Sequence, residues 1–471
     1  MTAIEQLGTY VPRYALSAET VEEAWGQFHG AGIEQTAVPG GDEDTLTMAY
    51  EAAANALAAS DRSQGEIERL IVATTTPPLE EEAMGSRLRS TLGLDESIRS
   101  RQLTGSTRAG VEALLTAAEA PGTALVVVSD SPRGAPDSEI EQAGGASAVA
   151  AIVGDDDGGE ITDHAARVEA VPGTRFRPAG TGETDGLGIA TYDRNAYTSA
   201  VGTVGNEVGV EGVDAVALQA PNGKLPYRAA GALGVETETI SAGTNVSEIG
   251  DTGAASPLFG LATAARSGAT ETVIVGYGSG DATALGIEGA IPVATDPHDE
   301  IVPQERKSLS YGEYLRIRGE ITTGEPEGGG AYVSVPSWKR TMPQRHRLVA
   351  GECTDCGTLA FPPEGACTEC GAFESYEQVV LPGTGTVEAA TEIGAGGAPP
   401  EFVEQQAKAG AYTSAVVALD GPDGGSVSIP AQVLGDDETT VGDRVTATIR
   451  RIYTQEDVIR YGFKMRPLSE S

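Results

Sequence analysis

Short apolar runs alternate with alanine-rich stretches along the first two thirds of the chain. Apolar runs at residues 70–75, 124–129 and 146–153 predict buried strands, because they combine β-branched and small residues. Residues 44–59 and 108–118 predict helices in alternation with these strands, and the first of them opens on an acidic cap. Such alternation is typical of an α/β layered domain.

The same pattern starts again after an acidic, glycine-rich turn at residues 155–159. Two successive halves of similar size suggest an internal duplication, although no residue-level repeat is visible. The second half predicts strands at 215–218 and 271–277 and helices at 192–208, 225–233 and 256–267.

The composition changes in the last third of the chain. Residues 319–330 are rich in Gly, Glu and Thr and are a candidate linker. Five short strand-like runs with turn signals between them predict a small barrel. These runs are residues 383–391, 415–419, 427–433, 443–452 and 458–465.

Charge sets this chain apart from an ordinary acidic protein. It has 471 residues, enough for about three domains, and carries 31 Lys+Arg against 69 Asp+Glu, a net charge of −38. We expect such a surface in the salt-rich cytoplasm of a halophile. Nucleic acid and anionic membranes are not expected partners, because phosphate contact needs a basic face.

No signal peptide or membrane span is expected either, which predicts a cytoplasmic protein. The few lysines are Lys224, Lys307, Lys339, Lys408 and Lys464.

All the cysteines of the chain lie in two Cys-x-x-Cys pairs, each followed by glycine. Cys353 and Cys356 form the first pair, and Cys367 and Cys370 form the second. This spacing predicts four thiolates around one structural zinc ion, and two disulfides or free thiols are the alternative. Four occupied ligand positions leave no open site for chemistry. No cysteine then remains to act as a nucleophile.

Several motifs resemble families of acyl-CoA enzymes. Residues 32–39, 42–49, 219–224 and 276–280 resemble archaeal hydroxymethylglutaryl-CoA synthase, a member of the thiolase superfamily, and the likeness covers about residues 1–320. The cysteine pairs, with the Phe-Pro-Pro at 361–363 and the run at 461–467, resemble the zinc-ribbon and OB-fold module that accompanies archaeal thiolase-family enzymes. The resemblance implies an α/β fold, a duplicated five-layered thiolase-like fold, followed by a small zinc ribbon and an all-β OB-fold barrel.

The resemblance also implies five parts along the chain. Residues 1–165 and 166–320 are expected to be the two thiolase-like halves, 321–345 a linker, 346–375 the zinc ribbon and 376–471 the OB-fold.

The catalytic positions that the resemblance implies are occupied by other residue types. The family uses a cysteine at a helix N-terminus, a glutamate and a histidine, and the matching positions here hold Thr107, Thr75 and Gln219. Ser106, beside Thr107, is the alternative hydroxyl. The glutamates at 80–82 are either a geometric substitute for the missing glutamate or a solvated helix start. A hydroxyl has a far higher pKa than a thiol and needs an adjacent base.

Other motif residues leave two interpretations open. Asn222 and Lys224 stand where the resemblance implies a contact with a CoA phosphate, and an ordinary surface lysine is the alternative. Asp251 stands where the family usually carries asparagine. A basic segment before the ribbon either meets CoA phosphates or an acidic surface, or is a linker helix paired with nearby carboxylates. Its members are Trp338, Lys339, Arg340, Arg345 and Arg347.

Three functions follow from these patterns. The first is an acyl-CoA-binding protein with a degenerate active site, which acts as a scaffold or partner subunit for a thiolase or synthase of acetoacetyl-CoA or mevalonate-type metabolism. The second is an active acyltransferase, a hydroxymethylglutaryl-CoA synthase or related condensing enzyme with non-standard catalytic residues, or an enzyme of another reaction on an acyl-CoA. The third, nucleic-acid binding by the barrel, is disfavoured because the tail is acidic and poor in aromatic residues. We expect structural zinc, a coenzyme A thioester ligand, and a homodimer or a hetero-assembly.

Overall fold

The computed structural model describes residues 2–294, 301–304, 306–321, 333–394, 396–399, 402–435 and 439–468. The chain forms two compact units. The first consists of Met1–Gly40, Asp44–Arg89 and Leu94–Tyr314, and the second of Gly41–Glu43, Ser90–Gly93 and Leu315–Ser471. Residues 322–332 of the expected linker lie outside the described residues.

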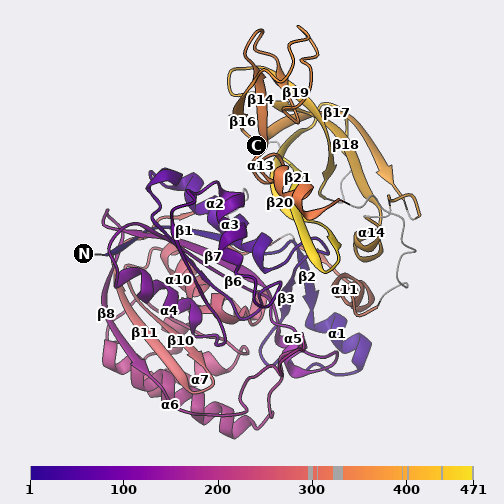
Figure 1. Cartoon of the computed structure of the whole chain (residues 1–471). Helices are drawn as coiled ribbons and strands as arrows, with labels where there is room; N and C mark the ends of the chain where they lie inside the picture. The colour runs from indigo at the N-terminus through magenta and orange to yellow at the C-terminus, as the bar shows by residue number, and fades with distance from the viewer. Residues whose placement is uncertain are drawn as a thin grey trace. The chain divides into compact units, whose positions relative to one another are not determined.

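A long sheet forms the frame of the first unit (Figure 1). Its strand order is β5-β4-β6-β7-β1-β8-β11-β10-β9, and a short strand, β12 (Val293–Ala294), pairs with β1. The strands are β1 (Ala3–Tyr10), β4 (Arg69–Ala73), β5 (Arg99–Leu103), β6 (Ala124–Asp130), β7 (Ser147–Gly154), β8 (Gly159–Arg167), β9 (Ala215–Leu218), β10 (Glu271–Gly278) and β11 (Asp281–Glu288).

The pairing of these strands repeats in the two halves of the unit. In the first half β4 is parallel to β6, which is antiparallel to β7, which is antiparallel to β1. In the second half β9 is parallel to β10, which is antiparallel to β11, which is antiparallel to β8. A short pairing of β1 with β8 joins the halves. The two halves therefore share the same order of parallel and antiparallel strand pairs, which agrees with the duplication that the alternating pattern suggested.

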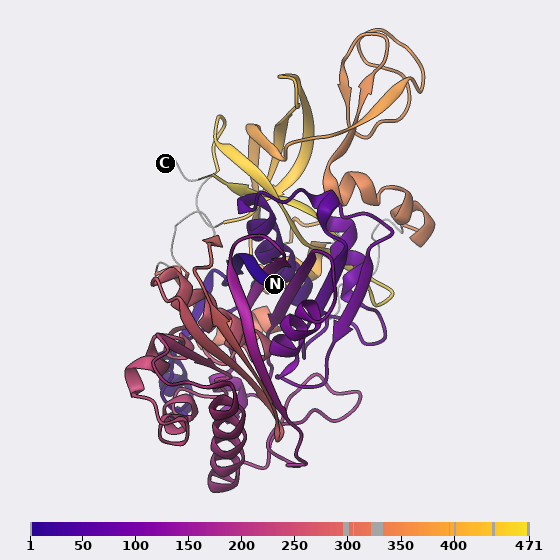
Figure 2. The same ribbon diagram turned by 90° about the vertical axis from the view of Figure 1, so that its left-hand side faces the viewer.

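Helices separate and cover the two halves of the sheet (Figures 1 and 2). Helices α4 (Ala109–Ala118) and α10 (Ser256–Arg266) contact each other and strands of both halves, so they form a middle layer. Helix α2 (Thr45–Ala59) packs on β1, β6 and β7, whereas α6 (Ala190–Val208) packs on β8, β10 and β11. The order helix, sheet, helix, sheet, helix gives the five layers that the resemblance implied.

Local sequence explains how α2 begins and how closely it packs. The side chain of Asp44 accepts hydrogen bonds from the amides of Leu46 and Thr47, both at 3.0 Å, as the predicted acidic cap requires. Gly8 of β1 lies against this helix, and a Cβ atom there would come within 2.4 Å of the Ala52 carbonyl oxygen. Small residues on both elements therefore allow the helix and strand backbones to approach closely.

Smaller elements complete the first unit. Strands β13 (Lys307–Ser308), β2 (Tyr14–Ser17) and β3 (Gln35–Val38) form a separate sheet. Other helices before residue 319 are α1 (Ala18–Trp25), α3 (Met84–Leu92), α5 (Glu139–Ala143), α7 (Leu225–Leu233), α8 (Thr237–Ser241), α9 (Val246–Ile249) and α11 (Tyr311–Arg318), of which α3 and α11 end in residues of the second unit. Within the described residues, no helix is both long enough and apolar enough to cross a membrane.

The second unit contains the expected ribbon and barrel. A small sheet of β15 (Leu359–Ala360), β14 (Val349–Cys353) and β16 (Tyr376–Val380) carries the cysteine loops. The barrel closes in the order β17-β18-β19-β21-β20 around buried apolar side chains such as Val417 and Met465, which confirms the predicted barrel. Its strands are β17 (Thr384–Ile393), β18 (Tyr412–Asp420), β19 (Ser426–Val433), β20 (Arg444–Gln455) and β21 (Val458–Pro467), and α14 (Val403–Ala409) lies between β17 and β18 in sequence.

The basic segment before the ribbon forms α12 (Val335–Arg340) and α13 (Met342–Arg347). Trp338 is buried, and the Arg345 guanidinium lies 4.1 Å from the centre of its ring. The Trp338 ring also meets Tyr453 of β20 edge to face, with ring centres 5.8 Å apart. Burial lowers the pKa of Arg345. The aromatic residue and one arginine of this segment thus pack within the second unit.

Candidate functional site

A pocket of about 430 Å³ opens in the first unit, where loops follow the ends of several strands. Crevices at the ends of strands are common ligand sites in α/β sheets. Its polar and aromatic lining residues include Thr107, Ser138, Glu139, Thr174, Arg175, Asp193, Tyr197, Asn222, Asp251, Tyr277 and Ser279. Of the catalytic and CoA-binding residues expected from the sequence, Thr107 and Asn222 line this pocket.

Thr107 lies immediately before α4, in the corner that follows β5. Its side chain is buried, and its hydroxyl donates a hydrogen bond to the Tyr277 carbonyl oxygen at 2.5 Å. The neighbouring Ser106 hydroxyl accepts from the Arg108 amide at 3.2 Å. Gly278 faces this corner, and a Cβ atom there would lie 2.2 Å from Ser106 Oγ. Over the described residues, neither hydroxyl is hydrogen-bonded to a carboxylate or an imidazole that would activate it.

Thr75 follows β4 and is held by Asp130, the last residue of β6. The Thr75 amide and hydroxyl both donate to this carboxylate at 2.8 Å. Thr74, Thr76 and the Ala254 amide also donate to it, at distances from 2.6 to 3.0 Å. Asp130 is completely buried. These bonds tie the ends of β4 and β6 together, so Thr75, which the resemblance matched to a glutamate, is part of a structural cluster.

Gln219 follows β9 and is completely buried. Its amide nitrogen lies 3.5 Å from Asp251 Oδ1, and Asp251 Oδ2 forms an ion pair with Arg175 Nη1 at 2.6 Å. The Gly253 amide also donates to Asp251, at 2.9 Å. Arg175 was not predicted from the sequence, because it lies in the long connection between β8 and α6 and belongs to no motif. Its guanidinium balances the charge of the buried Asp251 carboxylate.

Asn222 and Lys224 lie at the start of α7. The Asn222 side-chain oxygen accepts from the amides of Lys224 and Leu225, both at 3.0 Å, so it caps this helix. The Lys224 side chain is exposed and, among the residues described, forms no ion pair. Asn222 therefore has a structural role, and Lys224 leaves a free cation beside the pocket.

Two tyrosines and an aspartate also line the pocket, although the sequence analysis did not single them out. Tyr197 and Tyr277 meet edge to face with ring centres 5.2 Å apart, and the Tyr197 hydroxyl donates to the Gln219 carbonyl oxygen at 2.5 Å. Burial raises the pKa of both tyrosines. Burial also raises the pKa of Asp193, on the first turn of α6. Asp193 and Tyr197 are four residues apart and therefore lie on one face of a helix, which is the sequence signal that could have identified them as neighbours.

The glutamates at 80–82 are exposed, ahead of α3, and Glu82 pairs with Arg87. They line no part of the described pocket. This placement agrees with a solvated segment before a helix.

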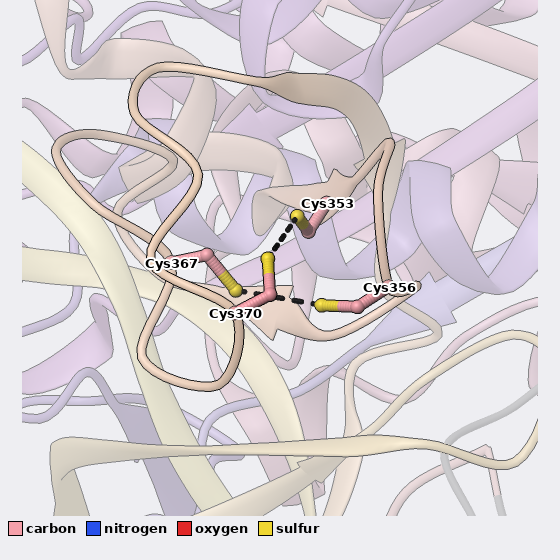
Figure 3. A group of neighbouring side chains, drawn as sticks. All are labelled: Cys353, Cys356, Cys367 and Cys370. Carbon is pink, nitrogen blue, oxygen red and sulfur yellow. Dashed lines mark hydrogen bonds between the residues drawn. The ribbon is translucent and has the colours of Figure 1, made fainter.

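The four cysteines of the ribbon point toward a common centre (Figure 3). Their sulfur atoms lie within 4.8 Å of one another, with Cys353 and Cys370 at 3.7 Å and Cys356 and Cys367 at 3.6 Å. A disulfide would require about 2.05 Å. Zn–S bonds of about 2.3 Å place sulfurs about 3.8 Å apart at the corners of a tetrahedron. The donor set therefore fits a zinc ion and does not fit the alternative of two disulfides.

Comparisons with known proteins agree with this architecture. A family model described as the ChsH2 rubredoxin-like zinc ribbon domain matches residues 340–375. The hydroxymethylglutaryl-CoA synthase of Archaeoglobus fulgidus is 28% identical over 344 residues, which cover 68% of this chain and 99% of the relative. That of Methanopyrus kandleri is 26% identical over 343 residues, covering 67% and 96%.

Solved structures show the same fold. An HMG-CoA synthase complexed with CoA matches with a TM-score of 0.59 and 18% identity, over 71% of this chain and 94% of that chain. The HMG synthase of the curacin biosynthetic pathway, in complex with holo donor-ACP, matches with a TM-score of 0.58 and 22% identity, over 67% and 88%. The predicted resemblance is confirmed. A thiolase-like α/β fold is followed by a zinc ribbon and a closed barrel.

Proposed function

We propose that this chain is an acyl-CoA-binding protein of the thiolase-like fold with a degenerate active site, and that it serves as a partner subunit for a thiolase or synthase. The observation that carries the proposal is the position of Thr107. This residue lies in the corner before α4, where the resemblance to the synthases implies a catalytic cysteine. Its hydroxyl proton is donated to a main-chain carbonyl. Transfer of an acyl group to this oxygen needs a base, and among the described residues no carboxylate or imidazole is hydrogen-bonded to it.

The pocket supports the binding part of the proposal. Its volume of about 430 Å³ is adequate for a small ligand, and its lining combines the rings of Tyr197 and Tyr277 and some aliphatic surface with many polar and charged side chains. Lys224, which forms no ion pair among the described residues, follows the lining residue Asn222 by two positions. We assign it to a phosphate of the ligand. One of the solved relatives of the same fold is complexed with CoA.

The partner role rests on the surfaces that the chain adds or leaves open. Within the described part of the first unit, β5 pairs with β4 alone, so its other edge is unpaired. Arg99, Ser100 and Arg101 of this strand are exposed. Unpaired edges are templates for another strand. We therefore expect a homodimer or a mixed assembly, with the ribbon and barrel as additional docking modules.

Covalent labelling tests the degenerate site. Purified wild-type protein and the Thr107→Cys variant are incubated with radiolabelled acetyl-CoA at high salt, and protein-bound label is counted after denaturation. We expect no label on the wild type and label on the variant, because a thiol at a helix N-terminus is a competent acyl acceptor. Label on wild-type Thr107 or Ser106, or hydroxymethylglutaryl-CoA formation above a no-protein control, would overturn the proposal in favour of an active acyltransferase.

Assembly is tested separately by affinity purification of tagged protein from its native cells. Recovery of a thiolase or an intact synthase in a fixed ratio is the expected result. A homodimer that turns over an acyl-CoA without any partner would contradict the scaffold role.

A further inference from the structure

The charged side chains that line the pocket of the first unit are mostly acidic. The lining contains one arginine, Arg175, and its guanidinium is paired with Asp251 at 2.6 Å. Arg177 is close by in sequence, but it donates to the Thr75 carbonyl oxygen and is not a lining residue. The other charged side chains of the lining are carboxylates that form no ion pair among the described residues: Glu139, Glu183, Asp185 and Asp193. The lining therefore favours a cationic ligand group over an anionic one.

Asp193 differs from the other three carboxylates in its burial. Glu139, Glu183 and Asp185 are exposed, so water solvates their charges. Asp193 is half-buried, its Oδ1 atom is inaccessible to solvent, and that atom has no hydrogen-bond partner in the described part of the chain. Burial raises the pKa of Asp193. A desolvated carboxylate without a cation is unfavourable, and a cation supplied by a ligand would remove this cost.

Tyr277 is a second pocket residue with an unused polar group. It is 6% exposed and lines the pocket, and its hydroxyl has no hydrogen-bond partner within the described residues. Burial raises the pKa of Tyr277, and the charge of Asp193 adds to that effect, so the two side chains are neighbours. The rings of Tyr277 and Tyr197 meet edge to face with centres 5.2 Å apart. Aromatic faces attract cations, so these rings suit the same kind of ligand group as Asp193.

An organic cation fits this position better than a metal ion. Over the residues that the structure describes, two groups of side chains lie close enough together to hold a metal: the ribbon cysteines, and Glu5 with Asp155 and Asp156. Asp193 belongs to neither group. A metal ion such as Ca²⁺ requires several oxygen ligands, whereas one carboxylate and an aromatic surface are sufficient for an ammonium group.

We propose that the acyl group bound in this pocket carries an ammonium group, which forms an ion pair with the Asp193 carboxylate. Because Oδ1 is inaccessible to solvent, the ammonium group reaches the carboxylate through Oδ2, with the Tyr277 ring beside it. The inference rests on acyl-CoA binding as proposed above and names the class of acyl group, a short amino-substituted one. No bond is made or broken, so a degenerate catalytic site is sufficient. Acyl groups that end in a carboxylate are disfavoured by the same charges.

Calorimetric titration with two matched thioesters tests the proposal. β-Alanyl-CoA and butyryl-CoA have acyl groups of nearly equal size, and the first ends in an ammonium group where the second ends in a methyl group. A buried, charge-assisted contact corresponds to about 10-fold or more in affinity, so the wild type should prefer β-alanyl-CoA by that factor. The titrations are done at high salt, which screens exposed carboxylates more than buried ones.

Two variants locate the source of the preference. Asp193→Asn should bring the two affinities together, because the amide keeps the shape of the side chain and removes its charge. Glu183→Gln is the matched control, since it removes an exposed carboxylate from the lining of the same pocket. It should keep the wild-type preference. Asp193→Ser replaces the first variant if thermal unfolding shows that the asparagine form does not fold.

The possible failures are distinguishable. Wild type that binds both thioesters with equal affinity overturns the inference and leaves acyl-CoA binding intact. A preference that persists without the Asp193 carboxylate, or that disappears in Glu183→Gln, overturns the assignment to Asp193. Binding of neither thioester by the wild type overturns both the inference and the binding function on which it rests.

Discussion

The ion pair between Arg175 and Asp251 shows how a single distant residue compensates a buried charge in this pocket. An aspartate with 2% exposure carries an unfavourable charge unless a cation is close, and the Arg175 guanidinium lies 2.6 Å away. The two residues are 76 positions apart in sequence, and Arg175 belongs to an irregular connection. No local pattern could have paired them. Asp251 was recognised as a departure from the family, but its partner became visible only in three dimensions.

Removal of Arg175 should therefore be costly. Arg175→Met leaves Asp251 buried without its cation, and we expect the free energy of unfolding to fall by about 3 kcal/mol. Adding Asp251→Asn should recover part of this loss, because the neutral amide has no charge to compensate. Urea unfolding of the two variants and the wild type at constant high salt measures the difference. Equal stability of the single and double variants would show that the ion pair is not coupled.

At the scale of elements, the close packing of β10 against the corner before α4 fixes the position of the Thr107 hydroxyl. Gly278 ends β10 and has Ser106 Oγ and Thr107 Oγ1 within 2.2 and 3.0 Å of the position a Cβ atom would take. Gly276 and Gly280, in the same glycine-rich run, also lie close to neighbouring segments of the chain. The two segments are far apart in sequence: the hydrogen-bonded residues Thr107 and Tyr277 are separated by 170 positions.

A methyl group at this contact tests its tightness. Gly278→Ala should lower the free energy of unfolding by about 1–3 kcal/mol, because the corner must move to accept the added atom. Gly231→Ala is the matched control, since Gly231 is exposed in α7 with open space at its Cβ position. It should stabilise the protein by up to about 1 kcal/mol, because alanine favours the helix. A thermal unfolding series of both variants would contradict this expectation if Gly278→Ala were neutral.

The zinc ribbon is the element whose stability depends most on a ligand. Its strands β14, β15 and β16 are short, so the metal is expected to hold the cysteine loops together. Structural zinc sites contribute on the order of 10 kcal/mol to the folding of small domains. The spacing of the cysteines was sufficient to predict this site from the sequence.

Cys367→Ser should lose most of the bound zinc and unfold the ribbon. Metal analysis of the purified protein is expected to give one zinc per wild-type chain and much less for the variant, with rapid proteolysis within residues 346–375. Thr354→Ala, an exposed change between two of the cysteines, is the control and should retain the metal. A full complement of zinc in Cys367→Ser would contradict the four-cysteine site.

For the whole molecule, the net charge of −38 sets the conditions for stability. Ion pairs such as those of Arg62 with Glu5, Asp155 and Asp156 offset only a part of the negative charge. The remaining carboxylates repel one another over distances set by the Debye length, which falls from about 10 Å at 0.1 M salt to about 3 Å at 1 M.

Raising KCl from about 0.1 M to about 1 M should therefore raise the free energy of unfolding. Denaturation by urea at each salt concentration measures this, because urea adds no charge. Sucrose at matched osmolality serves as a control for general exclusion of solutes. A decrease of stability with salt would contradict the expectation that the protein works in a salt-rich environment.

The sequence by itself determined the features that depend on local pattern. Hydrophobic periodicity placed α2, α4, α6, α7 and α10 within a few residues of their ends, because apolar spacing and capping are local properties. The spacing of the cysteines identified the metal ligands for the same reason. It also determined that no thiol is left for the body of the chain.

Only the tertiary structure decided what depends on residues distant in sequence. It revealed the duplicated strand pairing, because the equivalent strands share topology and not residues. It also supplied the Asp130 cluster, the partner of Asp251 and the unpartnered Asp193 in the pocket wall. Hydrogen bonds, burial and charge compensation between distant segments exist only once the chain has folded.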